Sequence, residues 1–175
     1  MKFGRLGVIQ RDQKGLTLLE LVIAIALVGA ITSGITMTIF QVFDTSSRTS
    51  NHMIAIRQVQ NAGKHVSEHL LQAQGWDLGG SSGFPLALNW TDWDDMQHGI
   101  LYTLEDMPYG EFKILRRRHD INSSPDSTIN VAEYIDPAQT SCVQAGGVFT
   151  FTVTANVSGQ SETRVYEVTP RSGSQ

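Results

Sequence analysis

One acidic side chain, Glu20, lies inside a stretch from Leu16 to Phe43 that carries no other charge. A carboxylate well inside a bilayer costs about 2.5–3.5 kcal/mol on insertion scales, so a simple membrane anchor gains nothing from it. A short segment rich in basic residues precedes the stretch and ends at Gly15. The position of the acid therefore suggests a specific partner of opposite charge.

Cleavage of the chain between Gly15 and Leu16 would supply such a partner. It would create an α-amino group, which is positively charged near neutral pH because its pKa in model peptides is about 7.7–8. The amine would lie one helical turn from Glu20, on the same face, and within reach of a neighbouring copy. Two buried opposite charges relieve each other's desolvation, whereas either one alone is costly. We therefore predict that Glu20 fixes the register between assembled subunits.

No other residues have the spacing of a catalytic or cofactor site. The Ser and His residues do not form a nucleophile elbow, and no Gly-rich segment matches a phosphate-binding loop. The single cysteine, Cys142, lacks the partners of a zinc site. We therefore expect a protein that is not an enzyme and has no cofactor. Cys142 cannot form an internal disulfide, and we predict a free thiol packed as a small apolar side chain.

The histidines are scattered along the sequence, at positions 52, 65, 69, 98 and 119. His65 and His69 are four residues apart on a predicted helix and could share a metal ion. No third ligand accompanies them in the sequence, so we predict that both lie on a solvated helix surface.

Three aspartates, Asp92, Asp94 and Asp95, form an acidic patch between aromatic residues. Closely spaced carboxylates suit a hard cation such as calcium, but this patch lacks the glycine and the terminal glutamate of an EF-hand loop. We therefore predict a solvated acidic loop, and the three aspartates are the candidate ligands should the chain bind calcium.

The charge of the chain argues against nucleic acid as a partner. The formal net charge is −4 at pH 7, and the first fifteen residues are basic, so the remainder is more acidic still. Nucleic-acid binding requires a basic surface. The run Arg116–His119 is the local exception, and we predict that it is a solvated strand end.

Residues 16–43 form a segment that is long enough to span a membrane. As a helix it would measure about 42 Å at 1.5 Å per residue, and the hydrocarbon core of a bilayer is about 30 Å thick. A secretory signal would have a shorter apolar core and a small-residue cleavage site. Because basic flanks stay cytoplasmic, we predict a single-pass protein of the inner (cytoplasmic) membrane, with its N-terminus in the cytoplasm and its C-terminal domain outside.

The helical pattern continues beyond the membrane segment to about Gln74. Apolar residues recur at spacings of three and four, which predicts one buried stripe on a polar helix. The stripe comprises Ile56, Val59, Gly63, Val66, Leu70 and Ala73. Gly75 is predicted to cap this helix, and the Gly- and Ser-rich segment Gly75–Gly83 is predicted to be a loop.

After this loop the pattern becomes that of strands. Residues 149–156 alternate between apolar and polar types, which is typical of a half-buried strand. Further strands are predicted at Leu86–Trp90, Gly99–Glu105, Glu111–Arg117, Ile129–Ile135 and Arg164–Thr169. The sequence therefore predicts an α+β fold, in which a long N-terminal membrane-spanning helix packs on a C-terminal antiparallel β-sheet.

The segment Lys14–Glu20, followed by a long apolar helix, resembles the class III signal of type IV prepilins and type II secretion pseudopilins. The resemblance implies a pilin-like fold, cleavage after Gly15 by a prepilin peptidase, and N-methylation of the new terminus at Leu16 by the same peptidase/methyltransferase. Phenylalanine is usual at that position, so Leu16 departs mildly from the pattern. The resemblance also implies assembly with other pilin or pseudopilin subunits, with a membrane platform protein and an assembly ATPase acting indirectly.

Looser patterns in the body are similar to those of J-type minor pseudopilins and PilW-like minor pilins. They comprise Tyr102–Leu104, Leu115–Arg117, Val131–Ile135 and Val168–Arg171. The resemblance implies a minor structural subunit of a type IV pilus or a type II secretion-like pseudopilus, located in a cell-surface fibre after assembly. One alternative is a competence-type pseudopilin in DNA uptake. Another is a membrane-anchored extracellular β domain acting as an adhesin or sensor, which would keep its leader and would not need Glu20.

These arguments divide the chain into four parts. Residues 1–15 are predicted to be a cytoplasmic leader peptide that is removed, and residues 16–43 the transmembrane and assembly helix in contact with the lipid bilayer. Residues 44–74 are predicted to continue this helix as an amphipathic segment, and residues 75–175 to form an extracytoplasmic antiparallel β-sheet domain.

Overall fold

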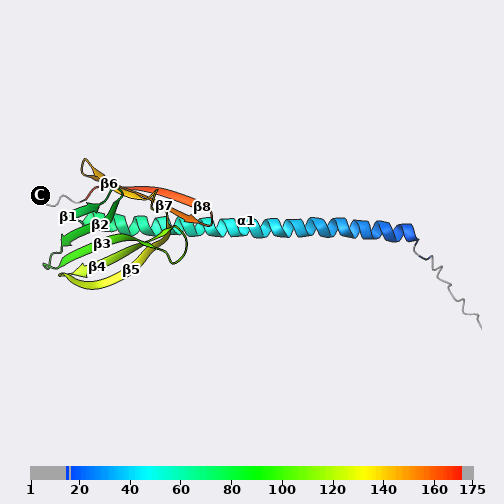
Figure 1. The fold of residues 1–175 in the computed structure, drawn as a ribbon, viewed down its shortest axis with the longest axis horizontal. Coiled ribbons are helices and arrows are strands. Elements are labelled where there is room, and N and C mark those ends of the chain that lie inside the picture. The colour runs from blue at the N-terminus through cyan, green and yellow to red at the C-terminus, as the bar shows by residue number, and fades with distance from the viewer. Residues whose placement is uncertain (1–14, 16, 171–175) are drawn as a thin grey trace, which may run out of the picture. The chain divides into compact units, whose positions relative to one another are not determined.

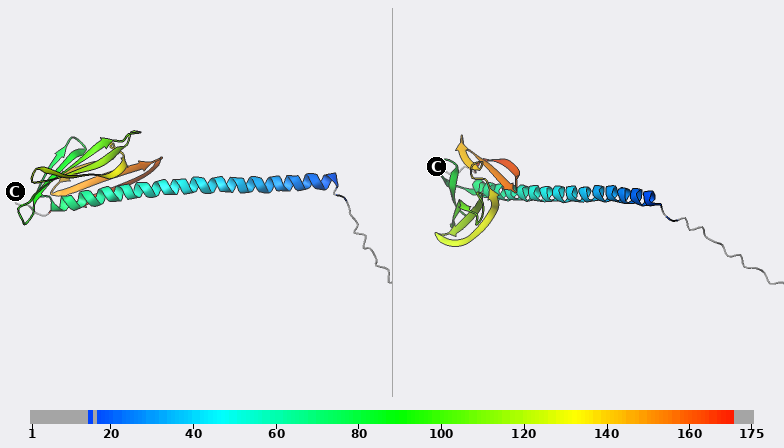
Figure 2. Two further views of the ribbon diagram at one scale, coloured as in Figure 1. Left: turned by 90° about the horizontal axis from the view of Figure 1, so that it is seen from below. Right: turned by 45° about the vertical axis from the view of Figure 1, so that its right-hand side comes forward.

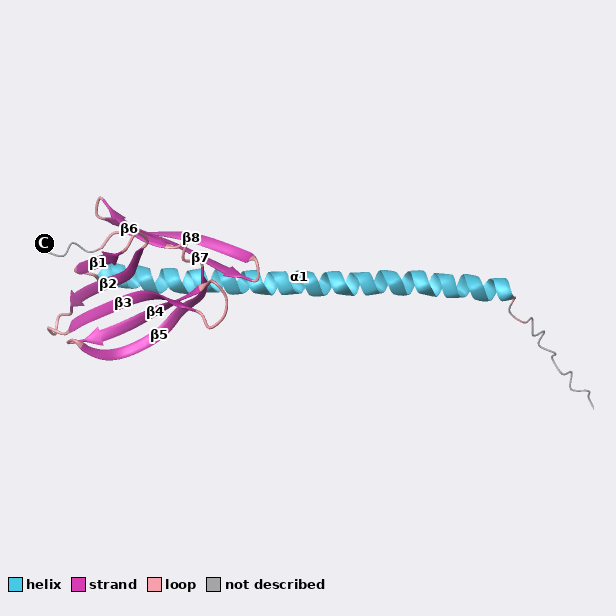
Figure 3. Cartoon of the chain, viewed as in Figure 1, coloured by secondary structure: helices cyan, strands magenta, loops and turns pink. Residues whose placement is uncertain are grey.

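The computed structural model describes residue 15 and residues 17–170, and these contain one long helix and an antiparallel sheet (Figures 1 and 3). Helix α1 comprises Leu18–Gln72. The chain divides into two compact units within this helix, between Thr45 and Ser46. A long apolar N-terminal helix followed by an antiparallel sheet confirms the predicted α+β class.

The N-terminal part of α1 is long and apolar enough to cross a membrane. Threonine hydroxyls within it donate hydrogen bonds to carbonyls one turn earlier. Thr32 donates to Val28 at 2.8 Å, and Thr38 donates to Gly34 at 2.9 Å. Because these hydroxyls are satisfied inside the helix, they need no water, and this part of α1 is compatible with an apolar environment.

The second unit contains the whole sheet. Its strands are β1 Gly75–Gly79, β2 Gly83–Thr91, β3 Gln97–Asp106, β4 Lys113–Ile121, β5 Ser124–Ile135, β6 Ser141–Ala145, β7 Val148–Val157 and β8 Gln160–Val168. Their order is β1-β2-β3-β4-β5-β7-β6, with β8 paired to β7. The sheet curves along one side of the C-terminal part of α1 (Figure 2).

Two narrow joints connect strands β1–β5 to strands β6–β8. At one joint, Ile135 in β5 pairs with Ala155 in β7. At the other, the Cys142 N–H in β6 donates to the Ser82 carbonyl just before β2, at 2.8 Å. Each set of strands also bonds to the helix by itself: the Glu133 N–H donates to Gln58 Oε1 at 2.8 Å, and the Tyr166 hydroxyl donates to a helix carbonyl.

The core lies between the buried stripe of α1 and the inner face of the sheet. The buried helix residues are Ala55, Val59, Ala62, Gly63, Val66 and Leu70. The predicted stripe is therefore confirmed from Val59 onward, although it begins at Ala55 and Ile56 is only half-buried. Among the described residues, every buried apolar side chain lies at or beyond Ala55, so the second unit contains its own core.

Gly63 allows the closest contact between helix and sheet. The ring of Tyr166 in β8 lies against the helix there, and a Cβ on Gly63 would be 2.0 Å from Tyr166 Cζ. The Tyr166 hydroxyl donates to the Val59 carbonyl at 3.2 Å, and the ring stacks on Phe151 with centroids 6.2 Å apart. Position 63 therefore requires glycine because of space.

The structure corrects two predictions about the segment after the helix. The loop predicted at Gly75–Gly83 contains strand β1, which pairs with β2 in the register Trp76↔Leu88. The predicted cap at Gly75 is also wrong, because α1 ends at Gln72 and Gly75 begins β1. The Gly and Ser content hid a short edge strand whose pairing depends on β2, which is distant in sequence.

The other predicted strands are confirmed, although β4 begins at Lys113 and not at Glu111, and β8 ends at Val168 and not at Thr169; strand β6 was missed. Strand β6 carries Cys142, which is buried and free. Burial raises the pKa of this thiol to about 11, so it stays protonated, as expected for a small apolar core residue.

Candidate processing and assembly site

The predicted cleavage position is open in the structure. Gly15 is exposed, and a Cβ added to it would meet no atom within 4 Å. Leu16, the predicted site of N-methylation, lies outside the described residues. Nothing in the described part of the chain therefore blocks access to the backbone at Gly15.

Glu20 closes a capping box with Thr17 at the start of α1. Its Oε2 atom accepts hydrogen bonds from the Thr17 N–H at 2.9 Å and from the Thr17 hydroxyl at 3.0 Å. In return, the Glu20 N–H donates to Thr17 Oγ1 at 3.2 Å. This reciprocal arrangement satisfies backbone donors that the first turn of a helix leaves without partners.

The capping box is a role that the sequence reasoning missed. Its pattern, a threonine followed three residues later by glutamate, was visible as Thr17-Leu18-Leu19-Glu20. The carboxylate of Glu20 therefore has a local partner even without a neighbouring amine. Charge pairing between subunits stays a prediction, and it must now be separated from helix capping by experiment.

The apolar side chains of the N-terminal part of α1 are exposed within the chain. Residues 17–50 are all exposed, and the large side chains among them include Ile25 at 64%, Ile31 at 63% and Phe40 at 69%. A surface of this kind requires lipid or other apolar helices as its environment.

The acidic patch does not gather its carboxylates. Asp92 Oδ2 lies 3.0 Å from His98 Nε2, and Asp94 Oδ1 accepts a hydrogen bond from the Met96 N–H at 3.3 Å. Within residues 15 and 17–170, no three His, Cys, Asp or Glu side chains are placed to hold a metal ion. Asp95 adopts a positive φ of 63° in the turn between β2 and β3.

The structure brings together four of the five scattered histidines. This histidine cluster comprises His65 and His69 on α1, His98 on β3 and His119 on β4. The prediction that His69 lies on a solvated surface was wrong, because its ring packs against the Trp90 ring with the two centroids 5.8 Å apart. Helical spacing correctly placed the two helix residues on one face, but it could not show which strands that face contacts.

His69 is neutral because of its surroundings. Desolvation lowers its pKa to about 4, and the positive charge of Arg117 acts in the same direction. Its Nδ1 atom lies 2.6 Å from the hydroxyl of Tyr102, which is the donor when the imidazole is neutral and Nδ1 is unprotonated. Burial raises the pKa of Tyr102, so the hydroxyl keeps its proton.

The basic run on β4 is divided between the two faces of the sheet. Arg118 is exposed and pairs with Asp120 at 3.1 Å, and Arg116 pairs with Glu105 at 2.6 Å. Arg117 and His119 pair with the buried Tyr102 and Ile100 and so lie on the helix side; both are half-buried, as is Arg116, so the prediction of a solvated strand end is confirmed only for Arg118. Strand alternation separates the cations and leaves no continuous basic surface along this strand.

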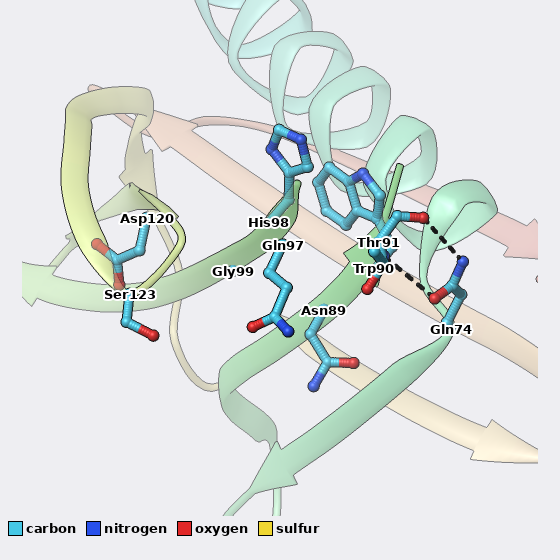
Figure 4. A pocket seen from close by; sticks show the side chains of 9 residues that line it. All are labelled: Gln74, Asn89, Trp90, Thr91, Gln97, His98, Gly99, Asp120 and Ser123. Atoms are coloured by element: carbon cyan, nitrogen blue, oxygen red, sulfur yellow. Dashed lines mark hydrogen bonds between the residues drawn. The ribbon is translucent and has the colours of Figure 1, made fainter. Parts of the chain in front are cut away.

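A polar pocket of about 530 Å³ lies at the end of β2 and β3 (Figure 4). In the figure, Trp90 and His98 point toward the helix, whereas Asn89 and Gln97 point to the opposite side. The amide of Gln74 bonds twice to the backbone of Thr91, with its Nε2 donating to the carbonyl at 3.2 Å and its Oε1 accepting from the N–H at 3.1 Å. These bonds attach the chain after α1 to β2 beside the histidine cluster.

Comparison with known proteins bears on the N-terminal region. Residues 10–36 match a family model described as the prokaryotic N-terminal methylation motif. No curated protein and no solved structure matches the chain. The matched residues include Gly15, Leu16 and Glu20, and they extend into the apolar part of α1. The chain thus carries the class III signal of type IV pilins and pseudopilins in front of a helix able to cross a membrane.

Proposed function

We propose that the chain is a minor structural subunit of a type IV pilus or a type II secretion-like pseudopilus, and that it acts by polymerising and not by catalysis. After cleavage between Gly15 and Leu16, the apolar part of α1 would bundle with helices of other subunits. A platform protein and an ATPase would drive this assembly from the membrane and the cytoplasm. The C-terminal unit would face the outside of the fibre.

The observation that carries this proposal is the matched signal together with the exposed apolar helix surface. A signal that is cut on its cytoplasmic side leaves the helix attached to the mature protein, so the apolar residues 17–43 stay available for lipid and then for other helices. The minor-subunit assignment is supported by the patterns in the body that are similar to minor pilins. The separation of the β4 cations and the acidic net charge favour fibre assembly over direct DNA binding.

Replacement of Gly15 by leucine tests the processing step. A peptidase must bind extended backbone at its site, so a side chain there should obstruct cleavage. Intact-mass measurement from a host with active prepilin peptidase should show that the wild-type chain has lost residues 1–15 and gained one methyl group. Gly15→Leu should keep its full length.

Gly29→Leu is the matched control, because a Cβ at Gly29 also meets no atom within 4 Å. It should be processed normally. A wild-type chain that keeps residues 1–15 in such a host would contradict the proposed function.

A further inference from the structure

Four side chains contact one another in a line at the end of the sheet that contains the β2–β3 turn and the β4–β5 hairpin. His98 Nδ1 lies 3.0 Å from His119 Nε2, and His119 Nδ1 lies 3.1 Å from Asp126 Oδ2. At the other end, Asp92 Oδ2 lies 3.0 Å from His98 Nε2. The two imidazoles are 11% and 18% exposed, whereas the two carboxylates are 44% and 47% exposed. The line therefore begins and ends near solvent and is buried in its middle.

The fold places each member of this line. His98 and Ile121 pair at the ends of β3 and β4, which brings His119 of β4 close to His98. A register shift between His119 and Asp120 leaves Asp126 opposite neither residue, and such bulges change the direction of a side chain. Asn122 and Ser123 both have positive φ, as a two-residue hairpin turn requires, so β5 returns directly beside β4.

Hydrogen counting fixes the protons along this line. Both carboxylates only accept, so His119 Nδ1 must carry the proton of its hydrogen bond to Asp126, and a lone pair on His98 Nε2 would be repelled by the Asp92 carboxylate 3.0 Å away. The contact between His98 Nδ1 and His119 Nε2 needs one proton more. All three contacts are favourable together when the four ring nitrogens share three protons, as one imidazolium and one neutral imidazole.

With any other number of protons, at least one of the three contacts becomes repulsive. With two protons, either two lone pairs face each other at 3.0 Å or a lone pair faces a carboxylate. With four protons, two N–H groups and two positive charges face each other. The three-proton state is the one in which all contacts are favourable.

In that arrangement the geometry favours His98 over His119 as the ring that carries the charge. Its contact with Asp92 is close, but the atoms do not have the angle of a hydrogen bond, and Nε2 is otherwise buried without a partner. An attraction between opposite charges needs no such angle, so this contact is useful when His98 is charged. Trp90 lies parallel to the His98 ring with centroids 5.1 Å apart and offers its π face to a cation. His119 then stays neutral and donates from Nδ1 to Asp126.

The groups around the two imidazoles include charges of both signs. His119 acts on His69 of α1, on which Arg117 of β4 and His65 also act, and Arg117 and Glu68 act on the neighbouring His65 and Tyr102. Arg117 opposes a further positive charge, and His69 is neutral above about pH 4. Arg117 therefore opposes the accumulation of a second positive charge in the histidine cluster.

We propose that Asp92, His98, His119 and Asp126 form a proton-binding latch that holds the β2–β3 turn against the β4–β5 hairpin. The latch is closed when the two imidazoles together carry one proton more than two neutral imidazoles would. Asp92 is the first residue of that turn, and its N–H donates to the Met96 carbonyl at 2.9 Å. The Gln97 N–H joins the two regions directly by donating to Asn122 Oδ1 at 3.0 Å. Loss of the shared proton releases the turn, which carries the almost fully exposed Trp93.

Nuclear magnetic resonance of the full chain in detergent, with ¹⁵N-labelled histidine, tests the proton count. At about pH 6 we expect His98 to be protonated on both ring nitrogens and His119 on Nδ1 alone. His98→Gln and His119→Gln assign the signals, and His52, which lies outside the cluster, is the internal reference. Two neutral imidazoles at this pH, or two imidazoliums, would overturn the proposal.

Hydrogen exchange at the Gln97 N–H tests the latch. After correction for intrinsic rates, we expect exchange to be roughly fivefold to tenfold slower at about pH 6 than at about pH 8.5, the range over which an imidazolium loses its proton. Asp92→Asn should bring this ratio close to one. Asp95→Asn, which makes the same charge change in the same turn and suits a positive φ, should leave the ratio intact. Equal ratios in the Asp92→Asn variant and the unmodified chain would refute the latch.

Discussion

Replacing Gly63 with alanine should destabilise the C-terminal unit by about 2 kcal/mol. A Cβ at this position would lie 2.0 Å from Tyr166 Cζ and 2.5 Å from its hydroxyl oxygen, so the ring must move. Movement breaks the hydrogen bond to Val59, worth about 1 kcal/mol, and forces the ring against Phe151, with an overpacking cost of about 1–3 kcal/mol. The better helix propensity of alanine returns about 1 kcal/mol.

The same substitution should become favourable when the ring is absent. In a Tyr166→Ala background the obstruction is gone, so Gly63→Ala should stabilise by up to about 1 kcal/mol through helix propensity alone. The double-mutant cycle should therefore give a coupling of about 3 kcal/mol between the two positions. A glycine that the helix backbone required for its own conformation would not show this reversal of sign.

Urea unfolding of the fragment 46–175, followed by circular dichroism, measures these energies. The fragment contains every buried apolar residue that the structure describes, so its core is intact. Equal destabilisation by Gly63→Ala in the presence and in the absence of the Tyr166 ring would refute the argument from close contact. It would point to a requirement of the helix backbone itself.

Three further predictions concern the start of α1, the half-buried His69 and the independence of the C-terminal unit. Glu20→Gln should keep the capping box but lose its charge, so we expect normal cleavage and, if charge pairing holds, poor incorporation into sheared fibres. Thr17→Val is the opposite control, because it removes the hydroxyl half of the capping box, leaves the backbone N–H bond to Glu20 and keeps the charge. His69 has a pKa of about 4 in the folded protein, so its contribution to stability is full above about pH 6.5 and is lost as the pH falls toward 4. Urea unfolding over this pH range should show that the free energy of unfolding falls by roughly 1–2 kcal/mol, a value reduced to allow for the partial exposure of the ring. The His69→Gln variant should not show this loss. The fragment 46–175 should be soluble and folded, and a largely unfolded circular dichroism spectrum would contradict the division at Thr45.

The sequence predicted the elements well where one local pattern decided them. The stripe on α1 and the alternation in β7 each arise from burial of one face, and both are confirmed. Strand β1 was missed because its five residues are stabilised by pairing with β2, which residue types alone do not show. The capping box was visible as a spacing but was overlooked because Glu20 was considered only for its charge.

The histidine cluster could not have been predicted from residue spacing. Its members are 4, 29 and 21 positions apart, and they meet because three elements cross at the end of the sheet. Which faces meet depends on strand register, and a shift of one residue would send His98 and His119 to opposite sides. The bulge that directs Asp126 has no marker in the sequence that we could identify.

The attachment of both strand sets to neighbouring helix residues has a mechanical consequence. Glu133 bonds to Gln58, and Tyr166 bonds to the carbonyl of Val59, so β1–β5 and β6–β8 are each held at the same turn of α1. A pull along the axis of α1 therefore reaches β6–β8 directly from the helix, without having to pass through the Ile135–Ala155 joint. The narrow joint is therefore relieved of part of an axial load, because each strand set has its own attachment to α1.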